Sequence, residues 1–85
     1  MRKPVFTPEG WEEFTEWARE DLKMVKKIIE LLDDTAQTPF TGIGKPEPLK
    51  YNLRGCWSRR ITREHRLVYE VTDEFIVVLA CKYHY

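Results

Sequence analysis

Basic side chains are concentrated in one stretch of this chain, residues 45–66 (KPEPLKYNLRGCWSRRITREHR), which holds seven of the 14 lysine and arginine residues. Only two acids, Glu47 and Glu64, lie in the same stretch, although the chain as a whole has no formal net charge. The basic excess is therefore local. Guanidinium groups bind phosphate oxygens in pairs and ammonium groups bind them as point charges, so the stretch predicts a surface for a phosphate backbone.

Arg60 and Arg66 are expected to lie close together, because they occupy strands joined by a tight turn. Adjacent guanidinium groups repel one another unless an anion lies between them. Glu64 or Glu70 would supply that anion in a surface ion-pair network, whereas the surplus of bases favours a phosphate bound bidentately. The bases that we expect to bind substrate are Lys45, Lys50, Arg59 and Arg60.

Glu47 lies between two prolines, which stiffen its backbone, and no other carboxylate occurs between Asp34 and Glu64. A carboxylate in such a position is either a solvated loop acid or a general base, and spacing alone does not separate the two. A general base must lie within hydrogen-bond reach of the proton that it removes. Lys50 is near enough in sequence to contact the same phosphate.

His84 is the penultimate residue and lies between Tyr83 and Tyr85. Histidine exchanges its proton near neutral pH, which suits a general acid. A terminal histidine is commonly just exposed, but His84 follows the most apolar segment, which would hold it in place. Tyrosines beside a basic surface stack on exposed bases, whereas core packing is the alternative for Tyr83. A base, an acid and a guanidinium clamp can cleave RNA through its own 2′-hydroxyl, without a metal ion.

The length of 85 residues indicates a single domain, residues 1–85, with one modest core. No apolar run approaches the ~18–20 residues that span a bilayer, and no secretion signal opens the chain, so the expected location is the cytoplasm. Cys56 and Cys81 are expected to be buried thiols rather than a disulfide. Two cysteines and two histidines are too scattered for a metal site, and no cofactor is expected.

The first half of the chain predicts one strand and two helices. Pro4 limits the strand at residues 1–6 to a sheet edge. Thr7 is expected to cap the first helix and Asp21 the second. Helical spacing assigns Trp11, Phe14 and Ala18 to the apolar face of the first helix, and Trp17 broadens that face. The apolar face of the second helix holds Leu22, Val25, Ile29 and Leu32 and is widened by Ile28 and Leu31.

The second half predicts a loop and then strands. Residues 33–48 hold prolines and glycines and are expected to form the loop. In one strand, Trp57, Arg59 and Ile61 share a face. The strands are expected at residues 49–53, 57–62, 66–72 and 75–83. The fold class is α+β, a β-αα-ββββ arrangement in which a two-helix hairpin packs on one face of an antiparallel sheet.

The segment KPEPLKYNLRGCWSRRITREHRLVYEV, with the ending ACKYHY, resembles the YoeB/Txe toxins of the RelE superfamily, and the likeness covers essentially the whole chain. The resemblance implies the same fold. It also implies a ribosome-dependent endoribonuclease, the toxin of a type II toxin–antitoxin system, that cuts translated mRNA in the A site of the 70S ribosome. The implied partners are a YefM/Phd-type antitoxin and a second copy of the chain in a homodimer.

The same resemblance implies a role for several residues by motif. Glu47 would be the general base, His84 the general acid, and Arg66 the group that stabilises the transition-state phosphate. Tyr85 would help to orient the nucleotide. The residues that would position the RNA backbone are Lys50 and Arg60.

A module that binds RNA or the ribosome without cleaving is the alternative function. The same basic surface would serve it, but binding alone does not need Glu47 and His84 as base and acid. A purely structural partner protein would leave the basic stretch unexplained.

Overall fold

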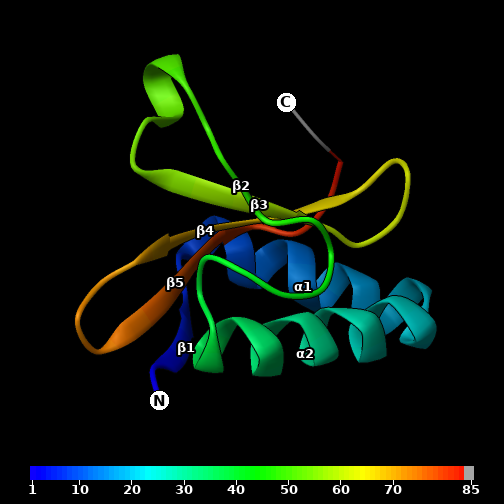
Figure 1. Ribbon diagram of the computed structural model, residues 1–85. Coiled ribbons are helices and arrows are strands. Elements are labelled where there is room, and N and C mark those ends of the chain that lie inside the picture. Colours follow the sequence, from blue (N-terminus) through cyan, green and yellow to red (C-terminus); the bar gives the residue numbers. More distant parts are fainter. Residues whose placement is uncertain (84–85) are drawn as a thin grey trace.

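The computed structural model describes residues 1–83 and shows two layers, a five-stranded sheet and a pair of helices that cover one of its faces (Figure 1). The order of the elements confirms the predicted β-αα-ββββ arrangement. No helix within residues 1–83 is both long and apolar enough to cross a membrane. The elements are β1 (Lys3–Phe6), α1 (Pro8–Glu20), α2 (Leu22–Gln37), β2 (Glu47–Pro48), the 3-10 turn η1 (Tyr51–Leu53), β3 (Cys56–Arg60), β4 (Arg66–Val71) and β5 (Phe75–Ala80).

The sheet has the strand order β1-β5-β4-β3-β2, and its last four strands in the sequence form an antiparallel meander. β1 pairs with β5 in the parallel direction, with Val5 opposite Val77, so the expectation of a wholly antiparallel sheet is wrong. The cause is the link after β1, because Thr7 alone joins it to α1, which packs against β5. Pro4 lies on an edge strand, as predicted.

Both helices begin where the sequence predicts. The Oγ1 atom of Thr7 accepts the N–H of Gly10 at 3.1 Å at the start of α1. Asp21 ends α1 and caps α2, and its carboxylate accepts the N–H of Lys23 at 3.0 Å. Because a single residue joins the two helices, they fold back on one another as a hairpin on one side of the sheet (Figure 1).

The core faces of both helices match the predicted faces in part: Ile28, Leu31 and Leu32 are buried as expected. Leu22 and Ile29, expected in the core, are 66% and 46% exposed. In α1, Trp17 is buried as predicted, whereas Ala18, expected on the same face, is exposed. Both helices carry more apolar residues than one face needs, so helical spacing allows a second assignment, and packing against the sheet selects it. The buried residues of α2 are Met24, Ile28, Leu31, Leu32, Thr35 and Ala36.

The segment before β3 is a hairpin loop, so the strand predicted at residues 49–53 is wrong. The strand that pairs with β3 is the short β2, and η1 follows it. Tyr51 and Gly55 have positive φ angles of 60° and 98°, which a strand does not contain. The helix α2 also continues to Gln37, so the loop that was expected from residue 33 begins later.

Candidate active site

The sheet face turned away from the helices carries an acid and two arginines on three neighbouring strands. Residues directly opposite one another on paired strands point to the same face. Glu47 on β2 is opposite Ser58 on β3, and Arg60 on β3 is opposite Arg66 on β4. Ser58 and Arg60 lie two residues apart, so all of these side chains share that face. The predicted closeness of Arg60 and Arg66 is confirmed.

Glu47 and Arg66 form an ion pair on this face. The Nη1 atom of Arg66 donates to the Oε1 atom of Glu47 at 3.2 Å, and the two side chains are 22% and 58% exposed. The sequence suggested Glu64 or Glu70 as the surface anion, but β2 places Glu47 there instead. An exposed pair of this kind contributes about 0–1 kcal/mol, so a phosphate can displace the carboxylate at little cost.

Tyr83, the last residue that the structure describes, is hydrogen-bonded to Arg66. The carbonyl oxygen of Tyr83 accepts the backbone N–H of Arg66 at 3.0 Å. Tyr83 is 63% exposed, so the alternative of core packing is wrong for its side chain. His84 and Tyr85, predicted as general acid and orienting residue, lie outside the described residues, and their roles stay predictions.

Three further bases of the basic stretch lie on the surface near Glu47. Lys45 is exposed and has a left-handed backbone with φ of 52°, directly before the proline that leads into β2. Lys50 is exposed between β2 and η1, and Arg60 is exposed at the end of β3. Within residues 1–83 none of the three forms an ion pair, so their charges are available to a phosphate backbone.

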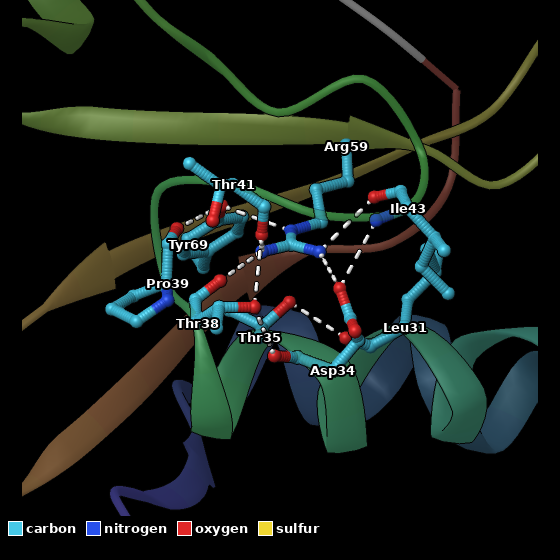
Figure 2. A network of polar contacts seen from close by, with 9 residues as sticks. All are labelled: Leu31, Asp34, Thr35, Thr38, Pro39, Thr41, Ile43, Arg59 and Tyr69. Carbon is cyan, nitrogen blue, oxygen red and sulfur yellow. Dashed lines mark hydrogen bonds and ion pairs between the residues drawn. The ribbon is translucent and has the colours of Figure 1, made fainter.

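Arg59 is different, and the prediction that it binds substrate is wrong. Its side chain is fully buried between the sheet and α2, and Figure 2 shows its guanidinium surrounded by acceptors. Nη1 donates to Asp34 Oδ2 at 2.6 Å, and Nε donates to Tyr69 Oη at 3.1 Å. The remaining donors bind the backbone carbonyls of Thr38 (2.6 Å), Thr41 (2.9 Å) and Ile43 (3.0 Å). All five N–H donors are thereby used, and none can reach an external phosphate.

The Arg59 network fixes the loop that leads into β2. Asp34 Oδ2 also accepts the N–H of Ile43 at 3.0 Å, and Tyr69 Oη donates to the carbonyl of Pro39 at 2.7 Å (Figure 2). The hydrogen bond from Arg59, followed by that from Ile43, holds the pKa of the Asp34 carboxyl below its usual value of 3.8. The loop of residues 38–44 is therefore bound by side chains of both the sheet (Arg59 and Tyr69) and α2 (Asp34). These contacts fix the position of the segment that precedes Glu47.

A second anchor, at the chain end, was missed in the sequence. Lys82 Nζ binds Glu16 Oε2 at 3.0 Å and Glu20 Oε2 at 2.9 Å, and the ammonium lies 4.8 Å from the centre of the Trp17 ring. Hydrogen bonds to Glu20 and Glu16 raise the Lys82 pKa above its ordinary value. The available signal was the spacing of the two glutamates, which places them on one face of α1.

Comparison with known proteins identifies the family and agrees with the fold. A family model described as the YoeB-like toxin of bacterial type II toxin-antitoxin system matches residues 6–85. The chain is 57% identical to Toxin YoeB of Escherichia coli strain K12 over 83 residues, which cover 98% of this chain and 99% of that relative. It is 47% identical to Toxin RelK of Mycobacterium tuberculosis over 85 residues, with both chains covered in full.

Solved structures show the same relationship. A YoeB/ParE toxin from Agrobacterium tumefaciens matches with a TM-score of 0.94 and 47% identity, over 98% of this chain and 99% of that chain. A chain in a YoeB-YefM complex from Staphylococcus aureus matches with a TM-score of 0.91 and 48% identity, over 100% and 99%. YafQ from E. coli, at 16% identity and a TM-score of 0.74, shares the fold alone. The chain therefore belongs to the YoeB-like toxin family of bacterial type II toxin–antitoxin systems.

Proposed function

We propose that this toxin is a ribosome-dependent endoribonuclease that cuts translated mRNA in the A site and so stops translation in the cytoplasm. One observation carries the proposal: Arg66 binds the side chain of Glu47 through its guanidinium and the carbonyl of Tyr83 through its backbone. Residues that are 19 and 17 positions away from Arg66 in the sequence thus converge on it. A candidate base and the residue before the candidate acid meet beside a phosphate-binding group.

The proposed reaction needs no metal ion. Glu47 takes the proton from the 2′-hydroxyl of the message, and that oxygen attacks the adjacent phosphorus. The bond from phosphorus to the 5′ oxygen then breaks, and His84 gives that oxygen a proton. The products are a 5′-hydroxyl on one fragment and a cyclic phosphate on the other, which hydrolysis converts to a 3′-phosphate. Arg66 binds the negative charge that develops on the phosphate oxygens.

The Glu47–Arg66 ion pair is suited to the resting state. A phosphate that arrives at Arg66 replaces the carboxylate with a stronger bidentate partner. Glu47 is then released within reach of the ribose attached to that phosphate. Its 58% exposure leaves the room that an incoming nucleotide requires. The flanking bases Lys45, Lys50 and Arg60 would bind neighbouring phosphates, and Tyr85 would orient the nucleotide.

The relatives support two protein partners. Solved structures include a YoeB dimer and YoeB-YefM complexes, all from S. aureus. We therefore infer that this chain is neutralised by a YefM/Phd-type antitoxin and forms a homodimer. Sedimentation of the toxin alone and with the coexpressed antitoxin would test both inferences.

The decisive experiment is single-turnover cleavage of message on programmed ribosomes. We expect Glu47→Ala, Arg66→Ala and His84→Ala each to lower the rate by about tenfold or more, because each removes a group that acts in the transition state. Matched controls are Glu70→Ala on the same sheet face and Arg63→Ala in the exposed turn, which should retain the wild-type rate. Wild-type rates in all three site variants would refute the assignment.

The chemistry of the cut has its own test. Labelling of the fragments should show a 5′-hydroxyl downstream and a phosphate, cyclic or at the 3′ position, upstream. A message with a single 2′-deoxynucleotide at the cut position should stay intact, because the nucleophile is missing. If translation stops while an all-ribose message also remains whole, the protein is the non-cleaving inhibitor instead.

A further inference from the structure

His65 lies in the turn between β3 and β4, and its side chain forms a hydrogen bond with the backbone of Tyr83, after β5. Its Nδ1 atom accepts the backbone N–H of Tyr83 at 2.7 Å. An accepting Nδ1 carries no proton, so the neutral ring carries its proton on Nε2. Neither the fold nor the predicted chemistry requires an acceptor at this position.

The backbone of His65 is bound within the turn, and its ring is packed against α1. Its carbonyl accepts the N–H groups of Ile61 at 2.9 Å and Thr62 at 3.2 Å, and its own N–H donates to Thr62 Oγ1 at 3.2 Å. The ring packs edge-on against Trp17, with centroids 4.8 Å apart and planes at 86°. An acceptor fixed in this way can define the position of whatever it binds.

Tyr83 is a point at which the chain changes direction. Its φ of 60° lies in the left-handed region, which costs a non-glycine residue about 1–2 kcal/mol. Two hydrogen bonds hold that conformation: the N–H is bound by His65 Nδ1 and the carbonyl by the N–H of Arg66. These bonds fix the backbone of Tyr83, which directly precedes His84 in the sequence.

The residues just before Tyr83 are anchored to α1. Trp17 Nε1 donates to the carbonyl of Cys81 at 2.8 Å, and Lys82 binds Glu16 and Glu20. These contacts hold the segment as far as Lys82 but do not fix the φ and ψ angles of Tyr83. His65 and Arg66 supply that last constraint.

We propose that His65 is a positioning residue for RNA cleavage, acting through the backbone of Tyr83, the residue directly before the proposed general acid in the sequence. This inference rests on the proposed function. His65 does not itself act on the reacting atoms. Its contribution is the acceptor Nδ1, and that contribution is separable from the packing of its ring on Trp17 and on the Tyr83 ring, whose centroid lies 5.2 Å away.

Two substitutions separate the acceptor from the packing. His65→Asn places its Oδ1 on Cγ, as Nδ1 is, and so keeps the acceptor while losing the ring. His65→Phe keeps a ring against Trp17 and loses the acceptor. If His65 were merely structural, the phenylalanine variant would be the milder of the two. The positioning role predicts the opposite order for activity.

The first measurement is hydrogen exchange of the Tyr83 amide in the free toxin, which needs no RNA. We expect His65→Phe to lose the protection of this amide and His65→Asn to retain it. The second is single-turnover cleavage at saturating programmed ribosomes. His65→Phe should be slower by about tenfold or more at a melting temperature near that of the wild type, since small misplacements of reacting groups have such effects. His65→Asn should stay within about threefold of the wild-type rate.

Wild-type cleavage by His65→Phe, or an unchanged Tyr83 amide in that variant, would overturn the proposal. Equal losses in both variants, in proportion to their loss of melting temperature, would also overturn it. Failure of the parent proposal looks different, because the wild-type toxin would then leave message intact while the exchange of the Tyr83 amide still depended on the acceptor.

Discussion

Replacing Arg59 with methionine should destabilise the protein more than any other exchange of a basic residue. The substitution keeps an unbranched apolar stem and removes the guanidinium from the core. Five hydrogen bonds disappear, and the Asp34 carboxylate loses its cation. The carbonyls of Thr38 and Ile43 then lose the donors that Arg59 supplied, whereas the carbonyl of Thr41 keeps the hydroxyl of Thr38 at 3.0 Å.

The expected loss can be estimated from these contacts. Removing one partner of a buried ion pair costs about 3–5 kcal/mol, because the other charge stays buried and unpaired. Asp34 is one-third exposed and can regain some water, which places the value near the lower end of that range. A domain of 85 residues has a total stability of about 4–13 kcal/mol. At about 4–8 °C for each kcal/mol, a loss of about 3–4 kcal/mol lowers the melting temperature by roughly 15–30 °C.

Urea unfolding at pH 7, followed by circular dichroism, would measure the change. Arg60→Met is the matched control, since Arg60 is the next residue, is exposed and forms no ion pair within residues 1–83. Its stability should change by about 0.5 kcal/mol or less. If Arg59→Met does not fold, Arg59→Lys keeps the charge but loses the planar fork, and it should show an intermediate loss.

A difference of less than about 1 kcal/mol between Arg59→Met and Arg60→Met would refute this reasoning. The Arg59 network would then be a set of contacts with little net free energy. The loop before Glu47 would then not be fixed by this network, because a weak network cannot hold the loop in one conformation.

Three other substitutions or conditions test neighbouring parts of the structure. The pKa of Asp34 is lowered in the folded state, so the ionised carboxylate stabilises the protein above about pH 4, and this stabilisation is lost as the pH falls through the folded pKa. The free energy of unfolding should therefore decrease between pH 5 and pH 2.5, and Asp34→Asn should make this decrease smaller. Burial raises the pKa of the Cys81 thiol to about 12, so a disulfide reagent at pH 8 should label it only when urea unfolds the chain, and fast labelling of the native protein would contradict its burial. Gly42→Ala should lower stability by about 1–3 kcal/mol, because its φ is 120° and a Cβ would collide with the Asp34 carboxylate. Gly55 also has a positive φ but open space around it, so Gly55→Ala should cost less stability. Equal losses in the two variants would show that the collision is unimportant.

Local chemistry explains what the sequence predicted correctly. Thr7 and Asp21 cap helices because a short polar side chain binds the free N–H groups of the first turn, and no distant contact is needed. Arg60 and Arg66 meet because a tight turn joins their strands. The direction of β1 was predicted wrongly, since it depends on how α1 docks beneath β5, a contact between residues far apart in sequence.

Arg59 shows how a local count can mislead. The basic stretch was interpreted as a single surface, although alternation placed Arg59 on one face with Trp57 and Ile61. That face is the core, where Ile61 is buried. The alternation therefore already carried the correct answer, but a buried arginine is rare enough that charge seemed the stronger signal. Its acceptors come mainly from loop carbonyls, which no side-chain pattern reveals.

The candidate site is consequently built from two scaffolds rather than from one basic segment. Arg59 holds the loop that delivers Glu47 to β2, while His65 and α1 hold the segment that leads to His84. Arg66 lies where the two meet and binds a member of each. A substitution in either scaffold should therefore lower cleavage, although every proposed catalytic residue is still present in the chain. Replacing Lys45, Lys50 or Arg60 should instead weaken ribosome binding and make the binding affinity less dependent on salt concentration.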